Sequence, residues 1–265
     1  MRQRGRPLLR DARRTRAWPV LAGCVIVIAA LGLLLREQAR PDGLDSAVDT
    51  AMVASFSGHQ GVLPWLALPG STFPLIAVSL AIAVGCLVAG RPNGVVLAVT
   101  AVPVTAFLDD RVLKHLVDRT HAGQLSFPSG HAAAAMTLAA VLGVLLHDPA
   151  RRTATRVART ALVVAACAVT ALVAVGVIGL RWHYFTDTVG GVALGTGTVL
   201  ALAFLIDLGT VYVQGVPSAK SAANVELTDD STASSSMIRP SSLFSVSEVL
   251  EKFSEPMKIS EVDSP

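Results

Sequence analysis

The chain has 265 residues, of which 52% are hydrophobic and only 15% are charged, and its formal net charge at neutral pH is +3. Soluble domains carry about 25% charged residues, so the composition excludes an ordinary soluble domain and predicts an integral membrane protein. The three cysteines, Cys24, Cys86 and Cys167, all lie in apolar runs. Their odd number and unpaired spacing exclude a disulfide framework and a zinc knuckle.

Six apolar stretches follow one another along the chain, and each is long enough, or nearly so, to cross a bilayer, for which about 20 residues suffice. They predict an all-α fold, a bundle of six transmembrane helices at residues 18–35, 72–90, 94–108, 129–146, 160–180 and 188–211. The third stretch is short, and we expect it to continue as an amphipathic helix through Val112 and Leu116. Arg36 follows the first stretch without a small-residue cleavage site, so this stretch should be an anchor and not a cleaved signal peptide.

The arginines predict the orientation of the bundle. Seven of the first sixteen residues are arginines, Arg91 comes two spans later, and four more arginines lie between residues 151 and 159. Because Lys and Arg accumulate in cytoplasmic loops, the segments 36–71, 109–128 and 181–187 should lie outside the cytoplasm, and the protein should be a multi-pass protein of the plasma membrane. We divide the chain into a basic cytoplasmic N-terminus (1–17), a membrane domain (18–214) and a cytoplasmic tail (215–265). The tail is rich in Ser, Asp and Glu, and we expect it to be disordered.

The outer segment 36–71 has a helical pattern of its own. Leu44, Val48, Met52 and Phe56 recur every four residues, with Asp45 and Asp49 between them. This spacing predicts one apolar stripe on a helix. The stripe would lie on the outer leaflet or pack against the bundle, and the pattern favours neither alternative.

Chemistry-bearing side chains gather at the outer ends of the predicted spans. Ionisable residues at membrane depth cost free energy and are functional candidates. Each has a simpler explanation: Lys114 lies four residues after Asp110 and would form a surface ion pair, Arg119 would be a loop cation, and single histidines would lie at the membrane interface. Their combination, with no concentration of negative charge nearby in sequence, is harder to explain in this way. Its members are Lys114, Arg119, His121, Ser129, Gly130, His131, Arg181, His183 and Asp187.

The set predicts a binding pocket for phosphate. Ser129 is placed to cap a helix, and the free N–H groups at a helix N-terminus bind phosphate. Gly130 lets the backbone approach a ligand closely. The side chains expected to bind the phosphate oxygens are Lys114, Arg119 and Arg181, with His121 as a further candidate.

The same set predicts phosphoryl-transfer chemistry. His183 and Asp187 are spaced i, i+4, so on a helical turn they would face each other, and a carboxylate that accepts Nδ1–H leaves Nε2 free as a nucleophile. His131 would be the general acid for the departing oxygen. Such a site needs no metal and no cofactor. A zinc site built from these three residues is the alternative, but the surrounding cations would repel a divalent metal.

Two short segments resemble a known family. "PSGH" at 128–131, followed about fifty residues later by "HYFTD" at 183–187, is similar to the type 2 phosphatidic-acid phosphatase superfamily, which also includes the vanadium-dependent haloperoxidases. The resemblance covers roughly residues 70–210. It implies a helical bundle with an outward-facing site, in which a phosphohistidine forms on His183 and is then hydrolysed by water.

The chain departs from the family pattern at two positions. The family has Lys, six residues and then Arg-Pro, whereas Lys114 leads here to His121-Ala122, with Arg119 two positions early. The family also has Ser-Arg five residues before the second histidine, where this chain has Gly176-Val177. Arg181 lies four residues after Val177, one helical turn along the same face. We therefore hypothesise that Arg119 and Arg181 supply the missing guanidinium groups from shifted positions.

Three functions fit these features. The first is a membrane lipid phosphatase acting on an isoprenyl diphosphate, phosphatidic acid or a related lipid phosphate. The second is a phosphotransferase that uses another hydroxyl in place of water, and the third is a non-enzymatic protein that binds anionic lipids. The expected partners are a lipid phosphate and the membrane, not nucleic acid. Gly191 and Gly195 form a small-residue face that would serve a homo-oligomer or pack within the bundle.

Overall fold

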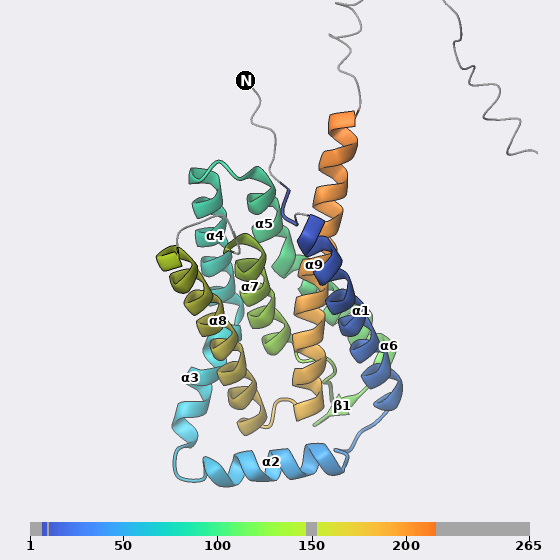
Figure 1. Cartoon of the computed structure of the whole chain (residues 1–265). Coiled ribbons are helices and arrows are strands. Elements are labelled where there is room, and N and C mark those ends of the chain that lie inside the picture. The colour runs from blue at the N-terminus through green and yellow to red at the C-terminus, as the bar shows by residue number, and fades with distance from the viewer. Residues whose placement is uncertain (1–6, 10, 147–152, 216–265) are drawn as a thin grey trace, which may run out of the picture. The chain divides into compact units, whose positions relative to one another are not determined.

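The computed structural model describes residues 7–9, 11–146 and 153–215. The tail that we expected to be disordered lies outside these residues except for Gly215, and so does much of the basic N-terminus. Within the described part the chain is almost entirely helical (Figure 1), which confirms the all-α prediction.

Each of the six predicted stretches forms a helix: α1 (Asp11–Leu34), α4 (Thr72–Val88), α5 (Pro92–Phe107), α7 (Gly130–Leu146), α8 (Thr153–Gly179) and α9 (Phe185–Gly215). Of the described helices, α1, α8 and α9 are long and apolar enough to cross a membrane. The helical run Gln60–Gly70 and α4, which are bent by 41° relative to each other, form a fourth such unit if they are taken together. Because α5 and α7 have 16 and 17 residues, six crossings remain a prediction.

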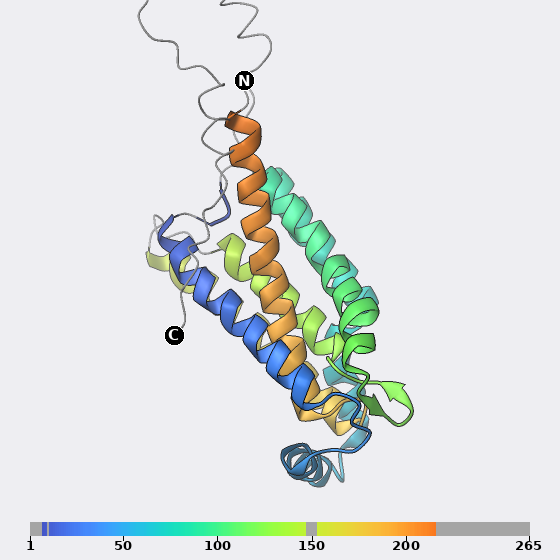
Figure 2. The ribbon, with the colours of Figure 1, turned by 90° about the vertical axis from the view of Figure 1, so that its right-hand side faces the viewer.

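The helix that begins with α5 continues past the predicted end of the third stretch. Its backbone runs on as the π-helical segment η3 (Leu108–Leu113) and then as α6 (Lys114–Val117), as the amphipathic pattern predicted. An antiparallel hairpin of β1 (Thr120–His121) and β2 (Gln124–Leu125) follows and extends beyond the end of this helix (Figure 2). π-Helical turns are rare overall but occur frequently at functional sites, so the side chains of η3 are further functional candidates.

The central helix α7 packs against α5, α8 and α9. It meets α9 at two glycines: a Cβ on Gly191 would lie 2.5 Å from the carbonyl oxygen of Ser129, and one on Gly195 would lie 2.4 Å from that of Ala133. Only glycine permits such a backbone approach. The small-residue face therefore packs within the bundle. The apolar core between α5, α7 and α9 includes the fully buried Leu97, Val141 and Val199.

The helix α2 (Gly43–Ser55) crosses one end of the bundle (Figure 1) and contacts α8 and α9. It begins where Asp42 accepts a hydrogen bond from the N–H of Asp45, a typical N-cap. Three residues of the predicted apolar stripe, Val48, Met52 and Phe56, are half-buried, so most of the stripe packs against the bundle, although Leu44 is 55% exposed. Asp45 is fully buried, so the helix is joined to the bundle through a charged side chain as well.

A short helical path leads from α2 to α4 and packs on α8. It consists of η1 (Gln60–Val62), α3 (Leu63–Ala67) and η2 (Leu68–Gly70). A Cβ on Gly176 of α8 would lie 2.7 Å from the backbone nitrogen of Ala67. The backbone of α3 therefore lies directly against α8 at this glycine.

Candidate active site

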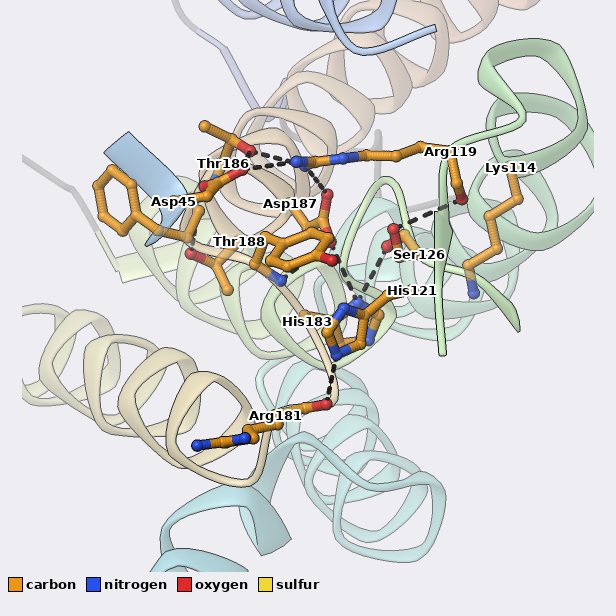
Figure 3. Close-up of polar contacts among 12 residues, drawn as sticks. Asp45, Lys114, Arg119, His121, Ser126, Arg181, His183, Thr186, Asp187 and Thr188 are labelled. Atoms are coloured by element: carbon orange, nitrogen blue, oxygen red, sulfur yellow. Dashed lines mark hydrogen bonds and ion pairs between the residues drawn. The ribbon is translucent and has the colours of Figure 1, made fainter. Parts of the chain in front are cut away.

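The predicted site residues come from segments that meet at one end of the bundle, and Figure 3 shows those outside α7: Lys114, Arg119, His121, Arg181, His183 and Asp187. The full set comes from α6 and the hairpin after it, from the start of α7, and from the turn between α8 and α9 together with the first turn of α9. The structure thus brings together segments that are far apart in the sequence. It also gives several of these side chains partners that differ from those predicted.

His183 lies in the turn before α9, and its ring is oriented by a backbone carbonyl group. Nδ1 is 2.9 Å from the carbonyl oxygen of Ser126. Because this oxygen can only accept, Nδ1 carries the proton and Nε2 of the neutral ring keeps its lone pair. Asp187, the predicted partner, lies 3.8 Å from Nδ1, beyond hydrogen-bond distance. The two side chains therefore lie close together, as the i, i+4 spacing predicted, but the Ser126 carbonyl oxygen and not the carboxylate accepts Nδ1–H.

Asp187 belongs instead to a buried ion-pair network. Its Oδ1 accepts a hydrogen bond of 2.6 Å from Arg119, and its Oδ2 accepts one of 3.0 Å from the N–H of Tyr184. The guanidinium group of Arg119 is fully buried and also binds Thr186 and Asp45. It lies over the ring of Tyr184 at 4.5 Å. Arg119 therefore holds the hairpin, α2 and α9 together, and its predicted role as a phosphate ligand does not fit this arrangement.

Asp45 is a member of this network that the sequence did not reveal. One of its carboxylate oxygens accepts the N–H of Thr186 at 2.9 Å, at the start of α9, and the other accepts the hydroxyl of Thr186 at 2.8 Å and a guanidinium N–H of Arg119. The partners are 74 and 141 positions away in the sequence. The only local signal was a carboxylate inside an amphipathic helix, and that signal does not identify a partner.

Lys114 lies between two carboxylates. Its Nζ is 2.6 Å from Asp110, the ion pair considered from the sequence, and 3.1 Å from Asp109, which was not considered. Lys114 is also near the start of α7, because its Nζ would lie 4.0 Å from a Cβ on Gly130. The lysine is therefore well placed to reach a phosphate group at this helix N-terminus, but it is already paired.

The first residues of α7 have partly the predicted geometry. The carbonyl oxygen of Ser129 accepts the N–H of Ala133 at 2.9 Å, the first helical hydrogen bond. The Ser129 hydroxyl group is fully buried and has no hydrogen-bond partner, so it does not cap the helix as expected. His131 is half-buried, with its ring 5.5 Å from that of Trp182. An unpaired hydroxyl beside a helix N-terminus is suited to donate to an anion.

His121 and Arg181 contact each other through the backbone. Nε2 of His121 is 2.7 Å from the carbonyl oxygen of Arg181, its ring packs edge-on against Tyr184 at 4.3 Å, and its Nδ1 is buried without a partner. Arg181 has a left-handed backbone with φ of 58°, and its exposed guanidinium group points away from His183 (Figure 3). The prediction that Arg181 continues a helical face from Val177 was wrong, because α8 ends at Gly179.

The structure also explains why this chain has Gly176-Val177 where the family has Ser-Arg. Gly176 faces the backbone of α3, and the side chain of Val177 is fully buried in an apolar cluster with Ala67, Ala135 and Val173. No arginine side chain fits there without displacing α3. The segment before α4 therefore occupies the space beside the site.

The charge balance differs from the cationic pocket that we expected. Lys114 faces two carboxylates, and so does Arg119. Burial raises the pKa of Asp109 to about 6, although the charge of Lys114 opposes this shift. Burial by itself would lower the pKa of Lys114, but Asp109 and Asp110 outweigh it and raise this pKa. The pKa of Asp49 also rises to about 6, through burial and the charges of Asp45 and Asp187.

A bundle of apolar helices with histidines at one end, beside a helix N-terminus, defines a membrane protein with a candidate phosphate site. The model of the PAP2 superfamily matches residues 75–208. The chain belongs to this superfamily. Among solved structures, it is similar to one described as the crystal structure of the first transmembrane PAP2 type phosphatidylglycerolphosphate phosphatase from Bacillus subtilis. The two are 19% identical with a TM-score of 0.53 over 76% of this chain and 98% of that chain, which shows a shared fold. No curated protein matches the chain significantly.

Proposed function

We propose that this member of a phosphatase superfamily is a lipid phosphatase of the cell membrane, with its site outside the cytoplasm. It would hydrolyse a phosphomonoester or diphosphate of a lipid, such as an isoprenyl diphosphate or phosphatidic acid. The observation that supports this proposal is the hydrogen bond from His183 Nδ1 to the Ser126 carbonyl oxygen, because it leaves Nε2 free as a nucleophile. The nearby start of α7 offers free N–H groups and the Ser129 hydroxyl group to a phosphate.

The reaction would have two steps. Nε2 of His183 attacks phosphorus, the bond from phosphorus to the lipid oxygen breaks, and the protonated His131 gives its proton to the departing oxygen. A water molecule, which loses a proton to His131, then attacks the phosphohistidine. The nitrogen–phosphorus bond breaks, and inorganic phosphate and free His183 result. Lys114 and the N–H groups at the start of α7 would stabilise the charge on the phosphoryl oxygens in both steps.

The test is phosphate release by the purified protein in detergent with EDTA present. Suitable substrates are an isoprenyl diphosphate, phosphatidic acid and phosphatidylglycerolphosphate, the last because the similar Bacillus subtilis protein is described as its phosphatase. We expect release from at least one of them and none by His183→Ala. The control His115→Ala changes an exposed histidine of α6 and should be fully active. Equal activity of His183→Ala would contradict the proposal.

The charge balance also favours a second candidate, a non-enzymatic protein that binds anionic lipids. Arg119 is paired with two carboxylates, and Arg181 points away from His183, so neither places a guanidinium group at the site. Lipid binding without phosphate release from any of the three substrates would support this candidate. Transfer of the phosphate to an added alcohol, without release of inorganic phosphate, would instead indicate the phosphotransferase.

A further inference from the structure

Asp109 occupies the position where a phosphate was expected to bind. Its Oδ2 would lie 2.9 Å from a Cβ on Gly130, so only glycine at the start of α7 leaves room for this carboxylate. Oδ2 also lies 3.1 Å from Nζ of Lys114. The carboxylate thus sits between the helix N-terminus and the lysine, the two features that a phosphate would use.

Unpaired polar atoms surround this position. Oδ1 of Asp109 is buried without a hydrogen-bond partner, and the residue as a whole is 2% exposed. The hydroxyl group of Ser129, the residue next to Gly130, is also buried without a partner. A buried polar atom without a partner costs free energy. Two of them beside one helix N-terminus indicate a site that gains its remaining contacts from a ligand.

Asp109 is not needed to hold Lys114. Asp110 pairs with the same nitrogen at 2.6 Å from a largely exposed position, where a charge is easily solvated. A second, buried carboxylate adds a desolvation cost and gives Lys114 more negative charge than it can balance. Its presence in the π-helical segment η3 therefore points to a role in ligand binding.

We propose that Asp109 is a proton-dependent ligand of the substrate phosphate. Its neutral carboxyl group would donate a hydrogen bond to a phosphate oxygen at the start of α7, and its carboxylate would exclude phosphate from Lys114. The proposal rests on the proposed function, because it takes Lys114 and the start of α7 as the phosphate site.

The direction of the pH effect follows from burial. Burial raises the pKa of Asp109 to about 6, so the group is largely ionised at pH 8 and largely neutral at pH 5. If only the neutral form binds, apparent affinity scales with its fraction, and binding at pH 8 is about 100-fold weaker than binding to the fully neutral form.

Other charged and titratable groups face the same point. Lys114 and Asp110, on the same helical run, act on Asp109 directly. Lys114 also acts on His131 of α7, and so does the charge of His183 before α9. A histidine also gains positive charge between pH 8 and pH 5 and favours an anion. The contribution of Asp109 must therefore be isolated with a variant that changes this group alone.

The experiment measures the binding of inorganic sulfate, whose charge is constant over this range, by calorimetry at pH 8 and pH 5. It uses the purified full chain and the variants Asp109→Asn, Asp110→Asn and Lys114→Met. The wild type should bind more tightly at pH 5, and Asp109→Asn should bind about 10- to 100-fold more tightly than the wild type at pH 8. Asp110→Asn should keep the pH dependence of the wild type, and Lys114→Met should lose binding.

Three results would overturn the proposal. If the pH dependence of Asp109→Asn equals that of the wild type, Asp109 is not the group that excludes the anion, while the phosphate site itself stands. If the wild type shows no gain in affinity at pH 5, the proposal fails without any variant having to fold. If none of the proteins binds sulfate at either pH, the anion site fails, and lipid phosphate release then decides separately whether the proposed function fails with it.

Discussion

At the scale of single residues, the chemistry of the site depends on which atoms are already paired. The Ser126 carbonyl oxygen holds Nδ1 of His183, and Asp187 is bound to Arg119. The sequence indicated that His183 and Asp187 belong to one site. It could not indicate the carbonyl group, because any residue supplies one and only the path of the loop decides its direction. The same holds for Asp109, whose role at the site depends on its position beside Gly130.

Arg181→Ala should lower kcat/KM by less than about tenfold. The loss of one donor to a transition state costs about 10²–10³ in rate, and the sequence pattern alone would predict such a loss. In the structure the exposed guanidinium group points away from His183. Arg181 contributes to the site through its backbone carbonyl oxygen, which is hydrogen-bonded to His121. The test is to measure kcat/KM of the folded variant and of the wild type by steady-state kinetics. A loss of 10² or more would mean that the side chain turns into the site when substrate binds.

Asp45→Ala should strongly destabilise the protein. It leaves Arg119 buried with one carboxylate instead of two and removes the acceptor for the N–H of Thr186. Breaking a buried ion pair from one side typically costs about 3–5 kcal/mol. The midpoint of thermal unfolding in detergent measures the effect, with Leu44→Ala on the exposed side of the same helix as control. Equal midpoints for the two variants would show that the network does not stabilise the fold.

At the scale of helices and strands, hydrophobic run length predicted the ends of the six long helices within about four residues, except that α1 and α8 begin about seven residues earlier than predicted. Continuous apolar runs are strong local signals. The hairpin β1–β2 was not predicted, because two-residue strands carry almost no periodic signal. For α2, the apolar stripe left open whether it lies on the outer leaflet or packs on the bundle, and most of it packs on the bundle. The pairing of Asp45 was not predicted, because its arginine partner is distant in the sequence.

Gly195→Ala should destabilise the contact between α7 and α9. The added Cβ would lie 2.4 Å from the carbonyl oxygen of Ala133, and such overpacking costs about 1–3 kcal/mol. Gly209→Ala on the same helix is the matched control, because nothing lies within 4 Å of its Cβ position. It should be neutral or stabilise the helix by up to about 1 kcal/mol. Thermal unfolding in detergent compares the two variants, and a harmless Gly195→Ala would contradict the packing of α9 on α7.

At the scale of the whole molecule, the orientation in the membrane decides which substrates reach the site. The positive charge of the predicted inner loops predicts that the candidate site lies outside the cytoplasm. In a variant without the three native cysteines, Gln124→Cys in the hairpin should react with an impermeant thiol reagent on intact cells. Ala154→Cys should react only after permeabilisation. The reverse pattern would turn the site toward the cytoplasm and change the candidate substrates.

The covalent intermediate offers the most direct test of the central claim, that His183 is the nucleophile of a lipid phosphatase. The purified protein is mixed with a lipid phosphate that it hydrolyses and is quenched rapidly in alkali, in which phosphohistidine survives. It is then digested for mass spectrometry. We predict one phosphate on the peptide that contains His183, absent from His183→Ala and lost when the quench is delayed until substrate is exhausted. Phosphate release without any phosphorylated His183, or with the phosphate on another residue, would contradict the account.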